Sequence, residues 1–338
     1  MTMTPPGHPD PSELSRPEVP SVRQSVVLDP HSEGSSARLI RRVKRHVYWA
    51  RTQGIRRVIE EDELDPVRKA VQRAQRWRWQ AGHPISPGTS TPVFLVGLQR
   101  SGTNMLARSL AASLEFDVHN ENDRRVFDRF LLRSDEVVRS VVATSPSRYT
   151  LFKPLCDSHR TAELLDGLGT ANPGRAIWMA RSVDGRLRSA VAKFGDVNRR
   201  VLAAIADGSG LRTWQCQGMS GEQLALVRSF DYDAMTAESA AALFWYLRNS
   251  LVFDLGLVDR ADVTVVWWDT LVRDPAPYMA ALCSFLGLEL RPSMMAHMGW
   301  RGAPTGAAVD IDPRIRDWCE GLEERLRAAA EQALRDPA

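Results

Sequence analysis

A short apolar run that leads into a glycine-bearing loop is the feature that most constrains the fold of this chain. Residues 93–106 read VFLVGLQRSGTNML, a strand pattern, then a polar loop between Gly97 and Gly102, then the start of a helix. This order points backbone N–H groups and a helix N-terminus at an anion. The usual nucleotide loop reads G-x-x-x-x-G-K-[ST], but here Thr103 stands in place of its lysine and Arg100 is the only cation. The loop predicts a phosphate-ester site with no provision for Mg²⁺.

Short apolar runs alternate with helical patterns along most of the chain, which is typical of a parallel sheet. We therefore predict an α/β fold: a P-loop-like central parallel sheet of four or five strands, with helices on both faces. Strands are expected at residues 93–96, 148–152, 176–179 and 263–267. Helices are expected to begin after Gly102, His159, Ser182, Ser220, Thr236 and Pro275. Ser220 and Gln223 have the spacing of a capping box.

The composition excludes several classes of protein. The 338 residues are 43% hydrophobic and 25% charged, as in ordinary globular domains. A net charge of +3 is too small to predict a nucleic-acid partner. The four cysteines are widely spaced and form no C-x-x-C pair, so neither a zinc site nor a disulfide framework is predicted. Without an apolar run of ~18 residues or the apolar core of a signal peptide, the expectation is a cytoplasmic protein.

The N-terminal part differs in composition from the rest. Residues 1–37 are rich in Pro, Ser, Gly and Glu and predict a disordered tail. Residues 38–82 form a basic helical extension, in which Pro66 is expected to open the second helix. This extension could contact anionic lipid at a membrane surface, or form a solvated hairpin on the domain edge, which its charge pattern favours. After a linker at residues 83–92, the main domain is expected to span residues 92–336.

A second anion site is predicted where another strand ends. Residues 177–189 read IWMARSVDGRLRS, so an apolar strand ends at Arg181 and Ser189 lies on the first turns of the following helix. In a parallel sheet this strand end shares the carboxyl edge with the Arg100 loop, and ligands bind at that edge. Arg181 and Ser189 together could therefore bind an anion there, although their spacing alone is common by chance.

Four segments, in this order, resemble the sulfotransferases that use 3′-phosphoadenosine 5′-phosphosulfate, PAPS. GLQRSGTNM resembles the family's 5′-phosphosulfate loop, commonly P-[RK]-S-G-T-[TN], and ARSVDGRLRS resembles its 3′-phosphate site. FKPLCDS is similar to the K-P-L-x-D-S segment of bacterial members, and WWDTLVRDP followed by SFLGL is similar to a late Y-E-D-L-x-x-D-P…F-L-G-L stretch. The resemblance covers residues 92–290. It implies transfer of a sulfuryl group from PAPS to a hydroxyl of a carbohydrate, glycolipid or secondary-metabolite acceptor.

The resemblance also implies site residues and a reaction without a metal ion. Arg100 stands at the family's Lys/Arg position, near the oxygen on which charge builds as the bisphosphate leaves, and fixed donors at such a place stabilise the transition state. Gln99 replaces the family's usual Pro, and Arg301 lies where the family often has a basic glycine loop. The implied donor-binding residues are Gln99, Arg100, Ser101, Gly102, Thr103, Asn104, Arg181, Ser189 and Arg301.

Two further departures from the family pattern concern acidic positions. Asp184 lies three residues after Arg181, where many relatives place an Asp at four, so its role is open. Trp268 and Asp269 stand for the family's Tyr-Glu and are interpreted as structural.

The acceptor hydroxyl must lose a proton, so a general base must lie within hydrogen-bond reach of it. Glu121 is our candidate, because it follows Arg100 by 21 residues, which resembles the placement of the catalytic Glu in protein-tyrosine sulfotransferases. Members that act on phenols and steroids use a His where this chain has Leu155. Further candidates for the base near the strand ends are His119, Asp123, Lys153, Asp157 and His159, the last three in the segment FKPLCDSH.

Two functions besides sulfuryl transfer stay open at this point. A nucleotide-dependent kinase is disfavoured by the missing loop lysine, and a non-catalytic nucleotide-binding relative by the presence of Arg100, Arg181 and Ser189 together. A group of aromatic residues could line an acceptor pocket or belong to the core, and helical spacing favours the core for the last three. These residues are Trp214, Phe230, Tyr232, Phe244, Trp245 and Tyr246.

Overall fold

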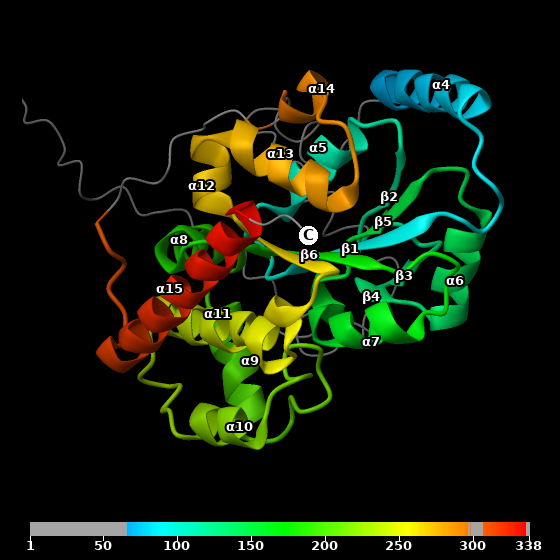
Figure 1. Ribbon diagram of the computed structural model, residues 1–338. Helices are drawn as coiled ribbons and strands as arrows, with labels where there is room; N and C mark the ends of the chain where they lie inside the picture. Colours follow the sequence, from blue (N-terminus) through cyan, green and yellow to red (C-terminus); the bar gives the residue numbers. More distant parts are fainter. Residues whose placement is uncertain (1–65, 297, 299–306, 336–338) are drawn as a thin grey trace, which may run out of the picture.

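The computed structural model describes residues 66–296, 298 and 307–335. Within this part of the chain, five parallel strands form one sheet in the order β2-β5-β1-β6-β7 (Figure 1). A two-stranded antiparallel hairpin, β3-β4, lies apart from it. The strands are β1 (Thr91–Gly97), β2 (Phe116–His119), β3 (Phe127–Asp128), β4 (Leu131–Leu132), β5 (Tyr149–Phe152), β6 (Arg175–Ala180) and β7 (Val263–Trp267). The predicted α/β class and parallel sheet are confirmed.

Strand β1 lies at the centre of the sheet because both of its faces are apolar. Phe94 and Val96 belong to one hydrophobic cluster, and Val93 and Leu95 to the other. Successive side chains of a strand point to opposite faces, so a run without polar residues suits a strand that is covered on both sides. After β1 the chain moves to β2 at one edge, while β6 and β7 lie on the other side of β1. The carboxyl end of β1 is therefore a switch point, where α/β sheets bind ligands.

Helices cover both faces of the sheet (Figure 1). One face packs α6 (Asp135–Thr144), α7 (Thr161–Gly167), α8 (Val183–Phe194), α9 (Val197–Ala206), α10 (Gly221–Arg228), α11 (Ala237–Asp254) and α15 (Pro313–Arg335). The other packs α5 (Thr103–Ala111), α12 (Trp268–Arg273), α13 (Pro275–Leu286) and α14 (Pro292–Met295). The remaining elements are α4 (Pro66–Gly82) and the 3₁₀ turns η2 (Leu155–Arg160) and η3 (Leu257–Asp259).

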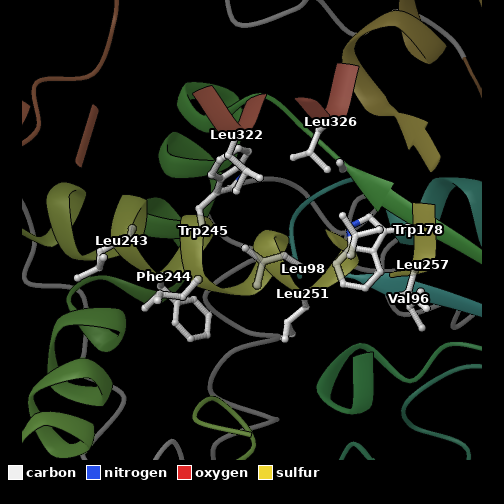
Figure 2. Packing of buried hydrophobic residues seen from close by; sticks show 14 of the residues in the cluster. Val96, Leu98, Trp178, Leu243, Phe244, Trp245, Leu251, Leu257, Leu322 and Leu326 are labelled. Atoms are coloured by element: carbon white, nitrogen blue, oxygen red, sulfur yellow. The ribbon is translucent and has the colours of Figure 1, made fainter. Parts of the chain in front are cut away.

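Helix α11 is the centre of the larger cluster, because it is apolar around most of its circumference and buried along most of its length. Trp245 of α11 lies in the same cluster as Trp178 of β6 and Leu322 of α15, and both tryptophans are fully buried (Figure 2). Phe244 is also buried and packs edge-on against Trp214, with ring centroids 6.1 Å apart. The three remaining aromatic candidates for an acceptor pocket, Phe230, Tyr232 and Tyr246, lie in or against this cluster. Tyr232, Phe244 and Trp245 therefore belong to the core, and the other three aromatic residues are partly buried and pack against it.

The predicted element starts agree with the structure at most positions. Helices α5, α8, α10, α11 and α13 begin where expected, and Ser220 and Gln223 form the capping box. The helix expected after His159 begins at Thr161, because η2 precedes it. Strand β1 begins at Thr91, inside the expected linker. The sequence patterns did not predict β2, the β3-β4 hairpin, or helices α6, α9, α12, α14 and α15.

Helix α4 begins at Pro66, as predicted, and contacts the main domain. The amide of Gln80 donates to Ser147 Oγ at 2.9 Å, and Arg76 lies 3.6 Å from the Asp117 carboxylate. The expected tail at residues 1–37 and residues 38–65 of the basic extension lie outside the described residues, as does Arg301. No helix in the described part of the chain is long and apolar enough to span a bilayer.

Candidate active site

The loop after β1 takes a shape that only glycine allows at two positions. Gly97 has φ 112°, and a Cβ there would lie 2.5 Å from the Met179 carbonyl oxygen of β6. Gly102 has φ 93°, and a Cβ there would lie 1.9 Å from the Trp268 ring. Gly102 is also the N-cap of α5 and leaves the helix start without a side-chain cap. The loop backbone therefore lies in close contact with β6 and with the Trp268 ring. The N-terminus of α5 has free backbone N–H groups, as an anion-binding site requires.

Side chains of other elements contact the carbonyl oxygens of this loop. The Arg181 Nη1 group donates to Arg100 O at 3.2 Å, and Arg186 Nε lies 3.5 Å from Gln99 O. Ser158 Oγ accepts from Gly97 N at 3.0 Å and lies 3.2 Å from Gly97 O. In a planar trans peptide the N–H points opposite to the C=O. The carbonyls of Gln99 and Arg100 point toward Arg186 and Arg181. The N–H groups of the same two peptides, those of Arg100 and Ser101, therefore point away from these arginines, as an anion site needs.

Arg186 is a buried cation that the sequence patterns did not mark. Its guanidinium donates from Nη1 to Ala241 O at 3.1 Å and lies 5.8 Å from the Phe244 ring centroid. Within the described residues, no carboxylate forms a salt bridge with it. Burial, and then the neighbouring Arg100, lower its pKa to about 9. A buried cation without a counter-charge is costly to the fold, and a bound anion would offset that cost.

The structure brings three predicted anion-binding residues together. Arg100 donates from Nε to Ser189 Oγ at 2.9 Å, and Arg181 donates to the Arg100 carbonyl. Burial lowers the pKa of Arg181; the Asp269 carboxylate opposes this shift, while repulsion from Arg100 and Arg188 adds to it. Two buried polar atoms, Arg181 Nε and Ser101 Oγ, make no hydrogen bond to any described residue. Clustered cations and unsatisfied polar atoms in one place fit an anion with several oxygens.

The acidic positions that depart from the family pattern have structural contacts. Asp269 accepts from the backbone N–H of Ser182 at 2.8 Å and from its hydroxyl at 3.0 Å, which fixes the turn into α8. Trp268 lies under the Arg181 guanidinium, 5.7 Å from ring centroid to Cζ. Asp184 accepts from Arg316 at 3.1 Å, so it ties α8 to α15.

The candidate base lies beside the loop. Glu121 Oε2 is 3.2 Å from Lys153 Nζ, and the same ammonium donates to Asn104 Oδ1 in the first turn of α5. The side chains of Lys153 and Glu121 are 6% and 18% exposed. Glu121 reaches this place because it follows β2, which pairs with β5 and ends level with it, His119 opposite Phe152. Two candidates for the base, Glu121 and Lys153, therefore lie in contact with each other at the start of α5.

Asp157 and His159, which the sequence also offers as bases, have different surroundings. Asp157 Oδ2 accepts from the backbone N–H of Leu132 at 2.8 Å, which fastens strand β4 to η2. Burial raises the pKa of Asp157 to about 6. Burial, and then the nearby Arg248, lower the pKa of His159 to about 4. Gln99, a predicted donor-binding residue, turns its amide toward Cys156 Sγ at 3.5 Å. The η2 segment thus supports the loop and the hairpin.

Among known proteins, similarity of low degree is found to solved structures. No family model matches this chain, and no curated protein matches it. Among solved structures, the chain is similar to the sulfotransferase domain from the Synechococcus PCC 7002 olefin synthase, with 15% identity and a TM-score of 0.34. The similarity covers 72% of this chain and 94% of that domain.

Proposed function

We propose that this chain transfers a sulfuryl group from PAPS to a hydroxyl of a carbohydrate, glycolipid or secondary-metabolite acceptor. The observation that carries the proposal is the meeting of Arg100, Arg181 and Ser189 at the loop after β1, through contacts of 2.9 and 3.2 Å. The loop and α5 would hold the 5′-phosphosulfate, and Arg181 with Ser189 would hold the 3′-phosphate. These residues fit such a donor because they offer cations, backbone N–H groups and unsatisfied polar atoms.

The remaining proposed donor contacts follow from position. Ser101, Thr103 and Asn104 lie at the start of α5, while Gln99 supports the loop through its carbonyl. Arg301 stays part of the proposal from the sequence alone.

The proposed chemistry uses two groups of this chain. The acceptor oxygen forms a bond to sulfur while the bond from sulfur to the bridging phosphate oxygen breaks, and the bisphosphate leaves with that electron pair. Arg100 would stabilise the charge that develops on the bridging oxygen. Glu121 would take the proton of the acceptor hydroxyl. Lys153, which contacts both Glu121 and Asn104, would hold the base beside the loop.

The proposal can be tested by ligand binding and then by turnover. Adenosine 3′,5′-bisphosphate, the product of the donor, should raise the melting temperature, because a ligand at 100 times its Kd adds about 2.7 kcal/mol to the free energy of unfolding. ATP with Mg²⁺ is the matched control. Incubation with PAPS and a panel of hydroxylated acceptors, followed by mass spectrometry, should then reveal sulfate added to one acceptor class. Stabilisation by ATP with Mg²⁺ alone would refute the proposal in favour of a kinase.

For the basic extension we propose peripheral contact with an anionic membrane surface. In the described part, Trp77 of α4 is 71% exposed and the next residue, Arg78, is exposed as well. Exposed aromatic and cationic side chains on one helix suit such a surface. Co-sedimentation with vesicles that contain phosphatidylserine tests this, and equal binding of neutral vesicles, or none of either, would refute it.

A further inference from the structure

We propose that His119 and Asp123 are positioning residues that hold Glu121 in place beside Lys153. The inference rests on the proposed function in assigning Glu121 a catalytic role, but the geometry that carries it belongs to the chain itself. Neither residue belongs to any of the four segments that resemble the sulfotransferases. His119 is the last residue of β2, and Asp123 lies in the segment that joins β2 to the β3-β4 hairpin.

Glu121 is a central residue of a tight turn. The backbone N–H of Asp123 donates to Asn120 O at 2.8 Å, which leaves Glu121 and Asn122 between the two ends of the turn. The side chains on either side of the turn also meet, with His119 Nδ1 2.8 Å from Asp123 Oδ2. Glu121 therefore lies at the tip of a turn that is stabilised by a backbone hydrogen bond and by a contact between side chains.

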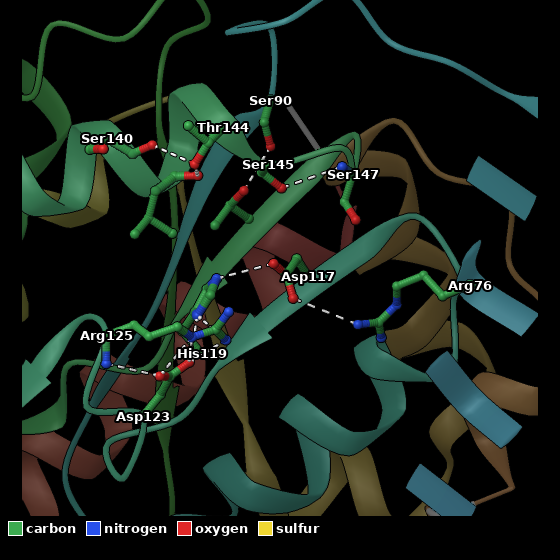
Figure 3. Close-up of polar contacts among 12 residues, drawn as sticks. Arg76, Ser90, Asp117, His119, Asp123, Arg125, Ser140, Thr144, Ser145 and Ser147 are labelled. Atoms are coloured by element: carbon green, nitrogen blue, oxygen red, sulfur yellow. Dashed lines mark hydrogen bonds and ion pairs between the residues drawn. The ribbon is translucent and has the colours of Figure 1, made fainter. Parts of the chain in front are cut away.

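The closing pair is part of a row of alternating basic and acidic side chains, shown in Figure 3. Arg125 Nη2 contacts Asp123 Oδ2 at 2.6 Å on one side. On the other side, His119 Nε2 lies 3.3 Å from Asp117 Oδ2, and Arg76 of α4 lies 3.6 Å from the same carboxylate. Although burial opposes it, hydrogen bonds from Arg125 and His119 lower the pKa of Asp123, so the carboxylate is ionised at neutral pH. Asp123 is thus held from both sides, by His119 and by Arg125, which leaves its side chain little rotamer freedom.

The His119 end of the pair is fixed to the sheet. Its side chain is fully buried, and its ring stacks on Phe152 of β5 with centroids 5.3 Å apart. Its carbonyl accepts from the backbone N–H of Lys153 at 3.2 Å. Lys153 is the residue whose ammonium contacts Glu121. His119 is thus bonded to Lys153 through its backbone and to Asp123 through its side chain. Together these two contacts set the position of the turn that carries Glu121 relative to Lys153.

The experiment measures kcat, the KM for PAPS and the Kd of adenosine 3′,5′-bisphosphate in Asp123→Asn, Asp123→Ala, Glu121→Gln and the double variant Asp123→Ala/Glu121→Gln. Asp123→Ala should lower kcat about 10- to 100-fold, because small misplacements of a reacting group cost that much. Asp123→Asn keeps an acceptor oxygen and should retain more activity than the alanine variant. The KM for PAPS and the bisphosphate Kd should change less than twofold. In the Glu121→Gln background, Asp123→Ala should have no further effect on kcat, because it acts through Glu121.

The matched control is Glu115→Gln. Glu115 is a buried carboxylate at the opposite end of the same two strands, 3.1 Å from Arg148. Its loss should lower the melting temperature as the Asp123 variants do, but leave kcat unchanged. If the effects of Asp123→Ala and Glu121→Gln on kcat multiply in the double variant, Asp123 does not act through Glu121 and the proposal fails.

A crystal structure of Asp123→Ala provides a readout that needs no activity. The carboxylate of Glu121 should leave Lys153 Nζ, which it contacts at 3.2 Å in the parent chain. Persistence of that contact would overturn the proposal even if the protein is an active sulfotransferase. Loss of the contact in a protein that never turns over PAPS would instead support the positioning role and refute the proposed function.

Discussion

Arg100 and Ser189 are separated by 89 positions in the chain, yet Arg100 Nε donates a hydrogen bond to Ser189 Oγ at 2.9 Å. The two residues come from the loop after β1 and from α8, the helix after β6, and β1 and β6 are neighbours in the sheet. Under the proposed function, Arg100 belongs to the phosphosulfate site and Ser189 to the 3′-phosphate site. The hydrogen bond between them therefore links the two proposed phosphate sites directly.

Arg100→Ala should abolish turnover while bisphosphate binding weakens less. The guanidinium would act on charge that develops in the transition state, and removal of one such donor costs about 10²–10³ in kcat. Arg100→Lys should keep part of the activity, since an ammonium can still stabilise the leaving oxygen. Steady-state kinetics with PAPS and calorimetry with the bisphosphate make the comparison. A kcat within a few-fold of the parent in Arg100→Ala would remove the loop from the mechanism.

Arg181→Ala should lower bisphosphate affinity by about tenfold or more, because a hydrogen bond to a charged group contributes about 1.5–3 kcal/mol. The variant should also lose discrimination against adenosine 5′-phosphosulfate, which lacks the 3′-phosphate. Both quantities can be measured by calorimetry with the two nucleotides. If Arg181→Ala still rejects the analogue as strongly as the parent does, the 3′-phosphate does not bind at Arg181.

Glu121→Gln keeps the shape of the side chain and removes its basicity. We expect kcat to fall by about 10²–10⁴ with little change in bisphosphate binding, and the acidic limb of the pH–rate profile to disappear. Asp157→Asn and His159→Ala are the controls. Should either of them show this behaviour while Glu121→Gln does not, the base belongs to the η2 segment.

Gly102→Ala should destabilise the loop and weaken bisphosphate binding. The position has φ 93°, and an added Cβ would lie 1.9 Å from the Trp268 ring. A left-handed backbone at a non-glycine residue costs about 1 kcal/mol, and the displaced ring adds to this. Gly221→Ala is the matched control, because Gly221 has open space around its Cβ position. Urea denaturation of both variants should show a lower midpoint for Gly102→Ala alone.

Asp157→Asn should become more stable relative to the parent as the pH rises. Burial raises the pKa of Asp157 from 3.8 to about 6, so the folded parent binds more protons than the unfolded chain between these values. The parent therefore loses stability as pH rises through that window, and the asparagine variant does not. Between pH 4.5 and 7.5 the difference in free energy of unfolding should move by about 2 kcal/mol in favour of the variant. Urea denaturation at both pH values measures it, and a constant difference would show that Asp157 is not perturbed.

The sequence by itself determined the fold class and the position of the anion loop. Both depend on local patterns: an all-apolar run predicts a strand covered on both faces, as β1 is, and Gly97 and Gly102 predict a turn that other residues cannot form. Helix starts at Ser220 and Thr236 could be predicted for the same reason, because a capping side chain bonds to backbone within three residues of it. These interactions are complete within short segments.

Only the tertiary structure decided which distant residues meet. Strand β2 was missed because its four residues, FDVH, include Asp117 and His119, whose partners Arg76 and Asp123 lie outside the strand. Without β2, the contact of Glu121 with Lys153 could not be derived. Arg186 escaped notice because an arginine in an amphipathic helix is usually solvated, and its burial against loop carbonyls follows from how α8 packs on α11. The partners of these charged groups come from elements that are distant in the sequence, so a local sequence pattern does not predict which groups pair.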